Sequence, residues 1–187
     1  MKEHLLYKQL DYALWVTSGC RFLSCRKYKS IYVSLQILII CLSFLLICIG
    51  ILNITEYKIS NMIPKENLDI SVLIISIFIF SLSIYLPSLS NKVNLLHDNA
   101  TNIASLLRML KLVKNEEYLK DISTSYDRYL KQINHDNIDF YRWIDFAKDS
   151  KYKHGVFESL LYLILWHFYS KIVYILCFII IFLISIR

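Results

Sequence analysis

The residues best suited to chemistry are two histidine–aspartate neighbours, His97-Asp98 and His135-Asp136, whose side chains are used in general acid–base catalysis. Such neighbours are common by chance, and the chain has no H-E-x-x-H, G-x-S-x-G, G-x-G-x-x-G or P-loop pattern. Its three glycines do not form a phosphate-binding loop. We therefore expect a protein that is not an enzyme and has neither catalytic residues nor a cofactor.

The five cysteines do not indicate a metal site or a disulfide. Cys41, Cys48 and Cys177 lie in apolar runs, whereas Cys20 and Cys25 lie on the side that we expect to face the reducing cytoplasm. The spacing Cys20-x4-Cys25 has no histidine nearby at a distance typical of metal ligands. We expect free thiols and no bound metal.

Small polar residues recur every seven positions in two apolar segments, as Ser34, Cys41, Cys48 and Thr55 in the first and as Asp69, Ser76, Ser83 and Ser90 in the second. Seven residues are nearly two helical turns, so each set forms one stripe on its helix. One hypothesis is close helix packing, which small residues favour in membranes. The other is that the stripes line a water-filled path in an oligomer, with Asp69 and Gln36 near its mouths. Serine hydroxyls can also bond to carbonyls of their own helix, so they do not require water.

The composition places these stripes in a membrane protein. Hydrophobic residues make up 56% of the 187-residue chain and charged residues 19%, whereas about 45–50% and about 25% are typical of soluble domains. The three glycines and two prolines are too few for a loop-rich or all-β fold. We therefore expect an all-α membrane protein.

Two uncharged segments are long enough to cross a bilayer. Residues 30–55 and residues 70–91, the latter with Pro87 near its end, run 26 and 22 residues without a charge, and a helix of this length spans the hydrocarbon core of about 30 Å. The 14 residues 56–69 between them make a membrane hairpin with a short loop. The hairpin, which consists of both apolar segments and the loop, covers residues 30–91.

The C-terminal segment, residues 158–187, is a third apolar helix. Its clean apolar run, residues 172–186, has 15 residues, or about 22 Å of helix, and is too short to span alone. If Lys171 extends its ammonium to the headgroups, Trp166 and Tyr169 lie at the interface and the helix spans, as we expect. The alternatives are a re-entrant or interfacial helix and a buried helix of the assembly.

The basic residues set the expected orientation. Six Lys or Arg residues lie in residues 1–30, two in the hairpin loop and eleven in residues 92–153. The positive-inside rule therefore places the N-terminus and the central region of a multi-pass membrane protein in the cytoplasm. The net charge of +6 favours contact with anionic lipid, and no nucleic-acid-binding motif accompanies it. The bilayer is the expected partner, and direct nucleic-acid binding is not expected.

Helical periodicity also marks the charged parts of the chain. Residues 1–29 form an expected amphipathic helix that lies along the inner leaflet or packs against the helices of residues 92–157. In the latter segment, a heptad seam is followed, after a break at residues 114–117, by a second helix in another register. The seam needs a partner, which is either the chain itself or another copy in a homo-oligomer. It consists of Val93, Leu96, Ala100, Ile103, Leu107 and Leu110.

Several local motifs resemble the SLATT family of two-transmembrane effectors. They are the segment WVTSGCRF at residues 15–22 with Arg26, the hairpin, the helix NKVNLLHDNATNIASLLRML, and YLKQINH at residues 129–135 followed by Ile138-Asp139-Phe140. The last stretch resembles the subgroup linked to reverse transcriptases. The matching motif positions are Trp15, Arg21, Arg26, Asn134, His135 and Asp139.

The resemblance covers most of the chain as one domain and implies a function. Such proteins are effectors of prokaryotic conflict systems, encoded beside nucleotide-signal synthases, sensors or reverse transcriptases. They are thought to oligomerise into a pore, or otherwise permeabilise the inner membrane, when an upstream element signals infection, which causes growth arrest or death. The alternative is a membrane-anchored adaptor whose cytoplasmic helices dock a partner protein.

Overall fold

The structure is a computed structural model that describes residues 2–54, 65–112, 116–134 and 137–147, together with Ile164 and Lys171. The described part contains four helices and no strand, which confirms the prediction of an all-α chain. The helices are α1 (Lys2–Ile54), α2 (Lys65–Leu112), α3 (Glu116–Gln132) and α4 (Asn137–Ala147). The C-terminal apolar segment lies outside the described residues apart from Ile164 and Lys171.

The expected N-terminal helix and the first span are a single helix, α1, of 53 residues. No proline interrupts this helix, and Gly19 and Gly50 lie within it. Likewise, the second span and the heptad seam share α2, which has 48 residues and contains Pro87. Proline is tolerated within helices at membrane depth. Helix α2 begins at Lys65, five residues before the expected start of the second span, so Asp69 is helical rather than part of the loop.

The chain divides into two compact units, which are described separately. Unit 1 comprises residues 1–30 and 91–170, and unit 2 comprises residues 31–90 and 171–187. Each unit contains one part of α1 and one part of α2.

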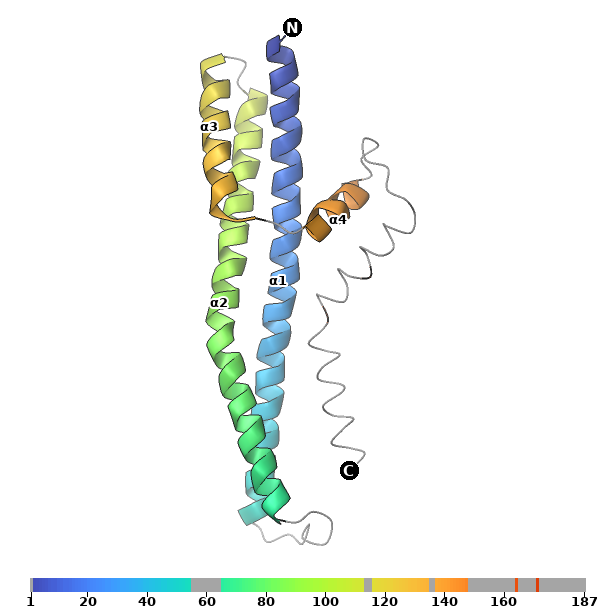
Figure 1. Cartoon of the computed structure of the whole chain (residues 1–187), viewed down its shortest axis with the longest axis vertical. Coiled ribbons are helices and arrows are strands. Elements are labelled where there is room, and N and C mark those ends of the chain that lie inside the picture. Colours follow the sequence, from blue (N-terminus) through green and yellow to red (C-terminus); the bar gives the residue numbers. More distant parts are fainter. Residues whose placement is uncertain are drawn as a thin grey trace. The chain divides into compact units, whose positions relative to one another are not determined.

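Unit 1 is a helical bundle in which α3 folds back beside α2 and packs against α1 (Figure 1). Its core contains Leu10 and Leu14 of α1, Ile103 and Leu110 of α2, and Ile122 of α3. Burying an aliphatic side chain of this size contributes about 1.5–3 kcal/mol. The break expected at residues 114–117 falls where α2 ends at Leu112 and α3 begins at Glu116.

The heptad seam lies in this core. Leu96, Ala100, Ile103 and Leu110 are buried, and Leu107 packs against the same cluster. The sequence leaves open whether the seam packs against its own chain or against another copy. In the structure, it packs against α1 and α3 of its own chain. The role of the seam in an oligomer stays a prediction, and it would require the bundle to open.

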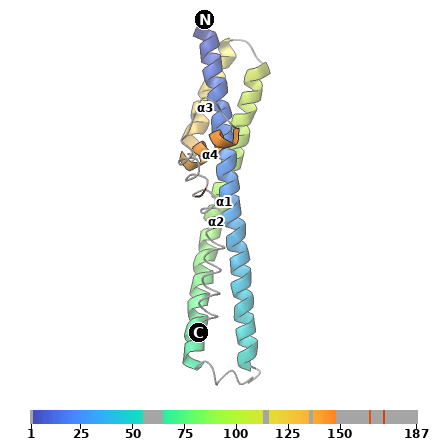
Figure 2. The same cartoon turned by 90° about the vertical axis from the view of Figure 1, so that its right-hand side faces the viewer.

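Helix α4 packs on α1 through a second, separate apolar cluster. Val16 and Cys20 of α1 contact Ile144 of α4, and aromatic side chains including Trp15 and Trp143 surround them. Helices α3 and α4 therefore lie on different sides of α1 (Figure 2). The N-terminal segment packs against helices of its own unit, which is one of the two arrangements that the sequence predicts.

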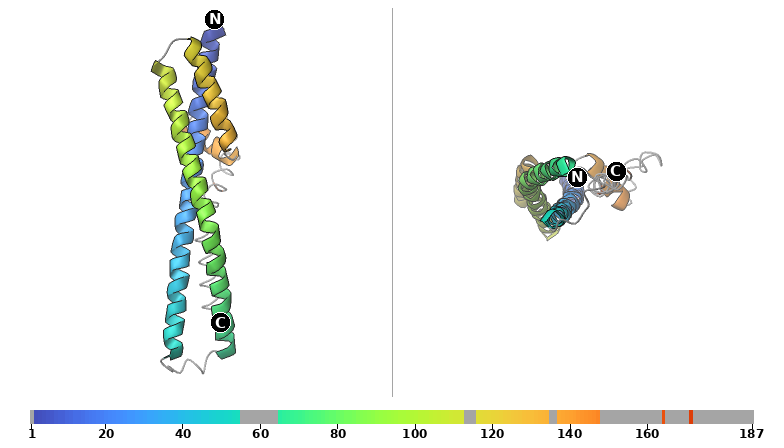
Figure 3. Two further views of the ribbon diagram at one scale, coloured as in Figure 1. Left: turned by 90° about the vertical axis from the view of Figure 1, so that its left-hand side faces the viewer. Right: turned by 90° about the horizontal axis from the view of Figure 1, so that it is seen from below.

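Unit 2 contains the later part of α1 and the early part of α2, which run antiparallel to each other (Figure 3). Both are long and apolar enough to cross a membrane, and only 22% and 6% of their most apolar windows is buried. Ile40, Phe44, Phe80 and Ile84 are all more than half exposed. Core helices of a soluble protein bury such side chains, so this surface fits contact with lipid.

Candidate functional site

Arg21 of α1 caps the C-terminal end of α3. Its side chain is fully buried, and its guanidinium donates to the Asn99 side-chain carbonyl and to the backbone carbonyls of Tyr129 at 3.1 Å and Ile133 at 2.7 Å. The last carbonyls of a helix lack partners in the helix and carry partial negative charge. A planar guanidinium can bond several of them at once. Burial lowers the pKa of Arg21 from its ordinary value.

Asn99 of α2 completes this cap. Its amide nitrogen donates to the Tyr129 carbonyl at 3.0 Å and to the Gln132 side-chain oxygen at 2.9 Å, while its own oxygen accepts from Arg21. A single polar group of α2 therefore connects α1 to the end of α3. No glycine lies at this helix end to cap it locally, so tertiary contacts satisfy its carbonyls.

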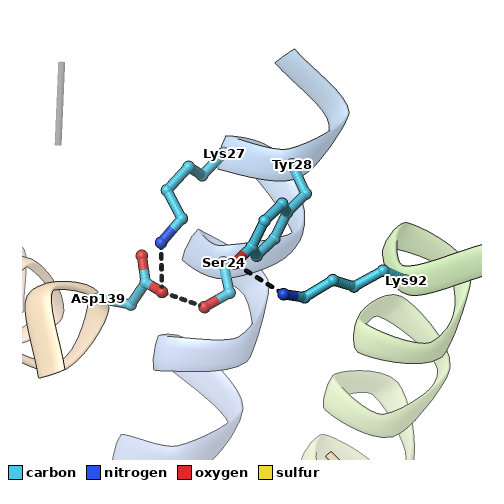
Figure 4. A network of polar contacts seen from close by, with 5 residues as sticks. All are labelled: Ser24, Lys27, Tyr28, Lys92 and Asp139. Atoms are coloured by element: carbon cyan, nitrogen blue, oxygen red, sulfur yellow. Dashed lines mark hydrogen bonds and ion pairs between the residues drawn. The ribbon is translucent and has the colours of Figure 1, made fainter. Parts of the chain in front are cut away.

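Asp139 in the first turn of α4 forms the second polar contact with α1. It accepts from the Lys27 ammonium at 2.9 Å and from the Ser24 hydroxyl, with the Lys27 and Asp139 side chains 4% and 0% exposed (Figure 4). Ser24 and Lys27 are three residues apart and share one helix face. An ion pair this deeply buried is costly to break by removing one partner, because the other charge stays out of water.

Aromatic packing reinforces the contact between α1 and α4. The Trp143 ring occupies the space that a Cβ atom at Gly19 would need. Its centroid lies 5.3 Å from that of Trp15. Glycine is required here because only a residue without a side chain lets the indole approach the backbone of α1. We call Arg21, Asn99, Ser24, Lys27, Asp139, Gly19 and Trp143 the interhelical latch.

A hydroxyl pair links α1 to α3 nearer their middle. Thr17 Oγ1 and the Tyr126 hydroxyl are 2.7 Å apart, and Tyr126 also donates to the Ala13 carbonyl at 3.4 Å. Burial raises the pKa of Tyr126, so the phenol is neutral at physiological pH. Buried Cys20 is similar, because burial raises its pKa from 9.0 to about 12 and leaves an inert thiol.

The sequence motif positions are only partly brought together. Trp15, Arg21 and Asp139 take part in these contacts, whereas the side chains of Arg26 and Asn134 are exposed. His135, and with it the His135-Asp136 pair, lies outside the described residues. His97 is exposed, with its ring 6.1 Å from that of Phe22. Among the described residues, no group of His, Cys, Asp and Glu could hold a metal ion.

The residues of the two polar stripes differ in exposure within unit 2. Ser34 is buried and Cys48 is intermediate, whereas Cys41, Asp69, Ser76 and Ser83 are exposed. Ser76 and Ser83 donate to the carbonyls of Val72 and Ile79, each at 2.8 Å, in the manner expected of serines in a membrane helix. Gln36 bonds to the Tyr32 hydroxyl at 2.9 Å.

Sequence reasoning assigned no role to five members of the latch: the polar residues Ser24, Lys27 and Asn99, and the packing pair Gly19 and Trp143. A signal for Asn99 was present, because it lies three residues after Leu96 and four before Ile103, on the apolar face of its helix. A polar side chain in that position predicts a buried hydrogen-bond partner. Ser24 and Lys27 carry no comparable signal, since their partner is 112 or more residues away.

Comparison with known families decides the identity of the chain. Residues 3–186 match the SMODS and SLOG-associating 2TM effector domain family 5. The chain belongs to the SLATT family. The match reaches into the C-terminal apolar segment. No curated protein and no solved structure matches the chain.

Family membership and the exposed apolar helices together make this SLATT protein a membrane effector domain. The resemblance inferred from the local motifs is thus confirmed at the level of the family. The subgroup linked to reverse transcriptases stays a prediction, as do the inner membrane and the cytoplasmic N-terminus.

Proposed function

We propose that this SLATT protein is a membrane effector of an antiphage system, and that several copies assemble to form a pore or to disrupt the inner membrane on activation. Growth arrest or cell death follows. One observation carries the proposal: the apolar helices of unit 2 have polar residues of one stripe, Asp69, Ser76 and Ser83, on the exposed surface of α2.

Two helices cannot enclose a water-filled path, so a pore requires several copies arranged around an axis. The serines of the exposed stripe suit such an assembly because their hydroxyls are already bonded to their own helix. They can therefore face water or a neighbouring helix at little cost. Asp69 is charged and exposed, and it suits a position at the mouth of the path.

Unit 1 is the proposed regulatory part. Following the positive-inside rule, we place it in the cytoplasm, where an upstream sensor or a reverse-transcriptase-type protein can act on it. Activation would then change the packing of the bundle, in which α3 and α4 are held on α1 by the interhelical latch. The homo-oligomer forms through unit 2, with the buried seam of unit 1 a further contact only if the bundle opens.

Expression of the full chain in bacteria loaded with a membrane-potential dye tests the proposal. We expect depolarisation followed by growth arrest under activating conditions or at high copy number. An intact potential with the protein present in the membrane fraction would contradict it. Ser76→Leu should reduce depolarisation, whereas Ser81→Leu serves as the control, since Ser81 is exposed and bonded to its own helix in the same way but lies off the stripe.

The second candidate function, an adaptor, has its own supporting observation in unit 1. Large apolar side chains are exposed where α1 begins, α2 ends and α3 begins, and these three helix ends lie together (Figure 1). They are Leu5, Leu6, Met109, Leu112 and Tyr118. Because α1 completes the core, binding should be tested with the full chain rather than with residues 92–157. A pull-down of the neighbouring gene's product that Leu112→Asp abolishes would favour an adaptor, and no capture would count against it.

A further inference from the structure

A basic group at the end of unit 1 has no acidic residue close to it in the sequence. Arg26, Lys27 and Lys29 lie in one stretch of α1, and no Asp or Glu occurs in residues 12–55 or in residues 70–97. Lys27 is paired with Asp139 of α4. Arg26 and Lys29 are exposed, and neither has an ion pair within the described part of the chain.

Lys92 of α2 joins this group through Tyr28. Its ammonium donates to the Tyr28 hydroxyl oxygen at 2.8 Å and lies 4.0 Å from the centre of the ring (Figure 4). The Lys27 ammonium lies 5.1 Å from the same ring centre. Because the Tyr28 oxygen accepts from Lys92, its own O–H proton can be donated to a further acceptor. Lys92 is thus an exposed cation held in a defined position.

Lys29 faces the same region. It follows Cys25 by four residues, and the Cys25 thiol donates to the Val93 carbonyl of α2 at 3.6 Å. Residues four apart share a helix face, so Lys29 lies on the side of α1 that is turned toward α2. Arg26 lies three residues before Lys29, on a neighbouring part of that surface. The positive charges of Lys29 and Arg26 reach this place, since they lower the pKa of Cys25 against the larger, raising effect of burial.

We propose that Tyr28, Lys29 and Lys92, supported by Arg26, bind the phosphate of an anionic phospholipid headgroup. The sequence indicates a lipid as the source of the phosphate, because the uncharged residues 30–55 directly follow Lys29 and the uncharged residues 70–91 directly precede Lys92. Basic residues beside a membrane segment attract anionic lipids, and tyrosine is enriched at that depth. The proposal rests on membrane insertion alone and not on pore formation.

Lipid binding is tested by titrating the full chain in neutral detergent with short-chain phosphatidylglycerol or phosphatidylcholine and counting bound lipids by native mass spectrometry. We expect phosphatidylglycerol, which is anionic, to bind more tightly than phosphatidylcholine. Each of Lys29→Gln and Lys92→Gln should weaken its binding about fivefold, the usual effect of one cation near a lipid surface. Tyr28→Phe, which keeps the ring, should weaken it less, and all variants should keep the helicity of the parent.

The matched control is Lys120→Gln, which removes an exposed lysine of α3 in the same unit. Equal binding of both lipids, or an equal loss in Lys120→Gln, would overturn the proposal, because either result would show general attraction to charge. Displacement of phosphatidylglycerol by millimolar inorganic phosphate would identify a site for free phosphate instead. None of these results depends on conductance, so they are separable from failure of the proposed function.

Discussion

Removing either partner of the buried Lys27–Asp139 ion pair should release α4 from α1. In Asp139→Leu, the Lys27 ammonium stays at a site where its side chain is only 4% exposed. In Lys27→Met, the fully buried Asp139 carboxylate keeps the bond from the Ser24 hydroxyl but loses its cation. Leaving one charge of a buried pair uncompensated costs about 3–5 kcal/mol. Because 1.36 kcal/mol is a factor of ten, α4 should open about a hundred to a few thousand times more often.

The double variant separates the ion pair from the rest of the contact. Lys27→Met with Asp139→Leu replaces both charges of the pair by apolar side chains next to the apolar cluster that holds α4, so neither partner is left buried without its counter-charge. Such replacements are often neutral or stabilising. We therefore expect the double variant to recover most of the protection that each single variant loses.

Hydrogen exchange of the α4 amides, measured by mass spectrometry on the full chain in detergent, reports this opening. Lys131→Met, which removes an exposed lysine of α3, is the control and should leave exchange in α4 unchanged. Unchanged protection of α4 in both single variants would refute the reasoning. So would a double variant that exchanges as fast as the single variants.

Three further predictions test other parts of the bundle. Gly19→Ala should displace the Trp143 ring at a cost of about 1–3 kcal/mol and speed the hydrogen exchange of α4. The control is Gly50→Ala, whose added Cβ meets no atom within 4 Å and should be tolerated. Equal exchange of α4 in the two variants would contradict the packing argument. Arg21→Lys should destabilise the C-terminal end of α3 by about 1.5–3 kcal/mol and so speed its hydrogen exchange, because an ammonium cannot reproduce the two guanidinium bonds to Tyr129 and Ile133. Exchange as slow as in the parent would argue against the cap. Burial raises the pKa of Cys20 from 9.0 to about 12, so its thiol should react with iodoacetamide at pH 8 about a thousandfold more slowly in the folded than in the unfolded chain. The contribution of Cys20 to the free energy of unfolding should be present below pH 9 and fade as the pH rises toward 12. Equal labelling rates in the folded and unfolded chain would contradict its burial.

The sequence predicts the elements that local pattern and length determine. Three of these features are local. The two uncharged runs correspond to the apolar parts of α1 and α2, and the heptad spacing from Val93 to Leu110 corresponds to a buried face of α2. The break before α3 corresponds to the end of α2. What the pattern does not reveal is continuity. The N-terminal helix and the first span have different compositions, but no helix-breaking residue separates them, and α1 runs through both.

The interhelical latch was harder to predict because its partners are far apart in the chain. Arg21 and Asp139 were singled out through family motifs, without their roles. Those roles depend on where α3 ends and α4 begins, which brings Arg21 to the Tyr129 carbonyl and Lys27 to Asp139 over separations of 108 and 112 residues. Glycine at position 19 has meaning only once the Trp143 ring is placed against it.

Conductance of the purified protein in planar lipid bilayers tests the central claim most directly. We expect discrete current steps from the full chain, smaller or rarer steps from Ser76→Leu and Asp69→Leu at equal insertion, and parent-like steps from Ser81→Leu. These residues are all exposed on α2, so the comparison isolates the stripe from general effects of an added leucine. The absence of steps from inserted protein, or the same loss in Ser81→Leu as in Ser76→Leu, would contradict a pore lined by this stripe.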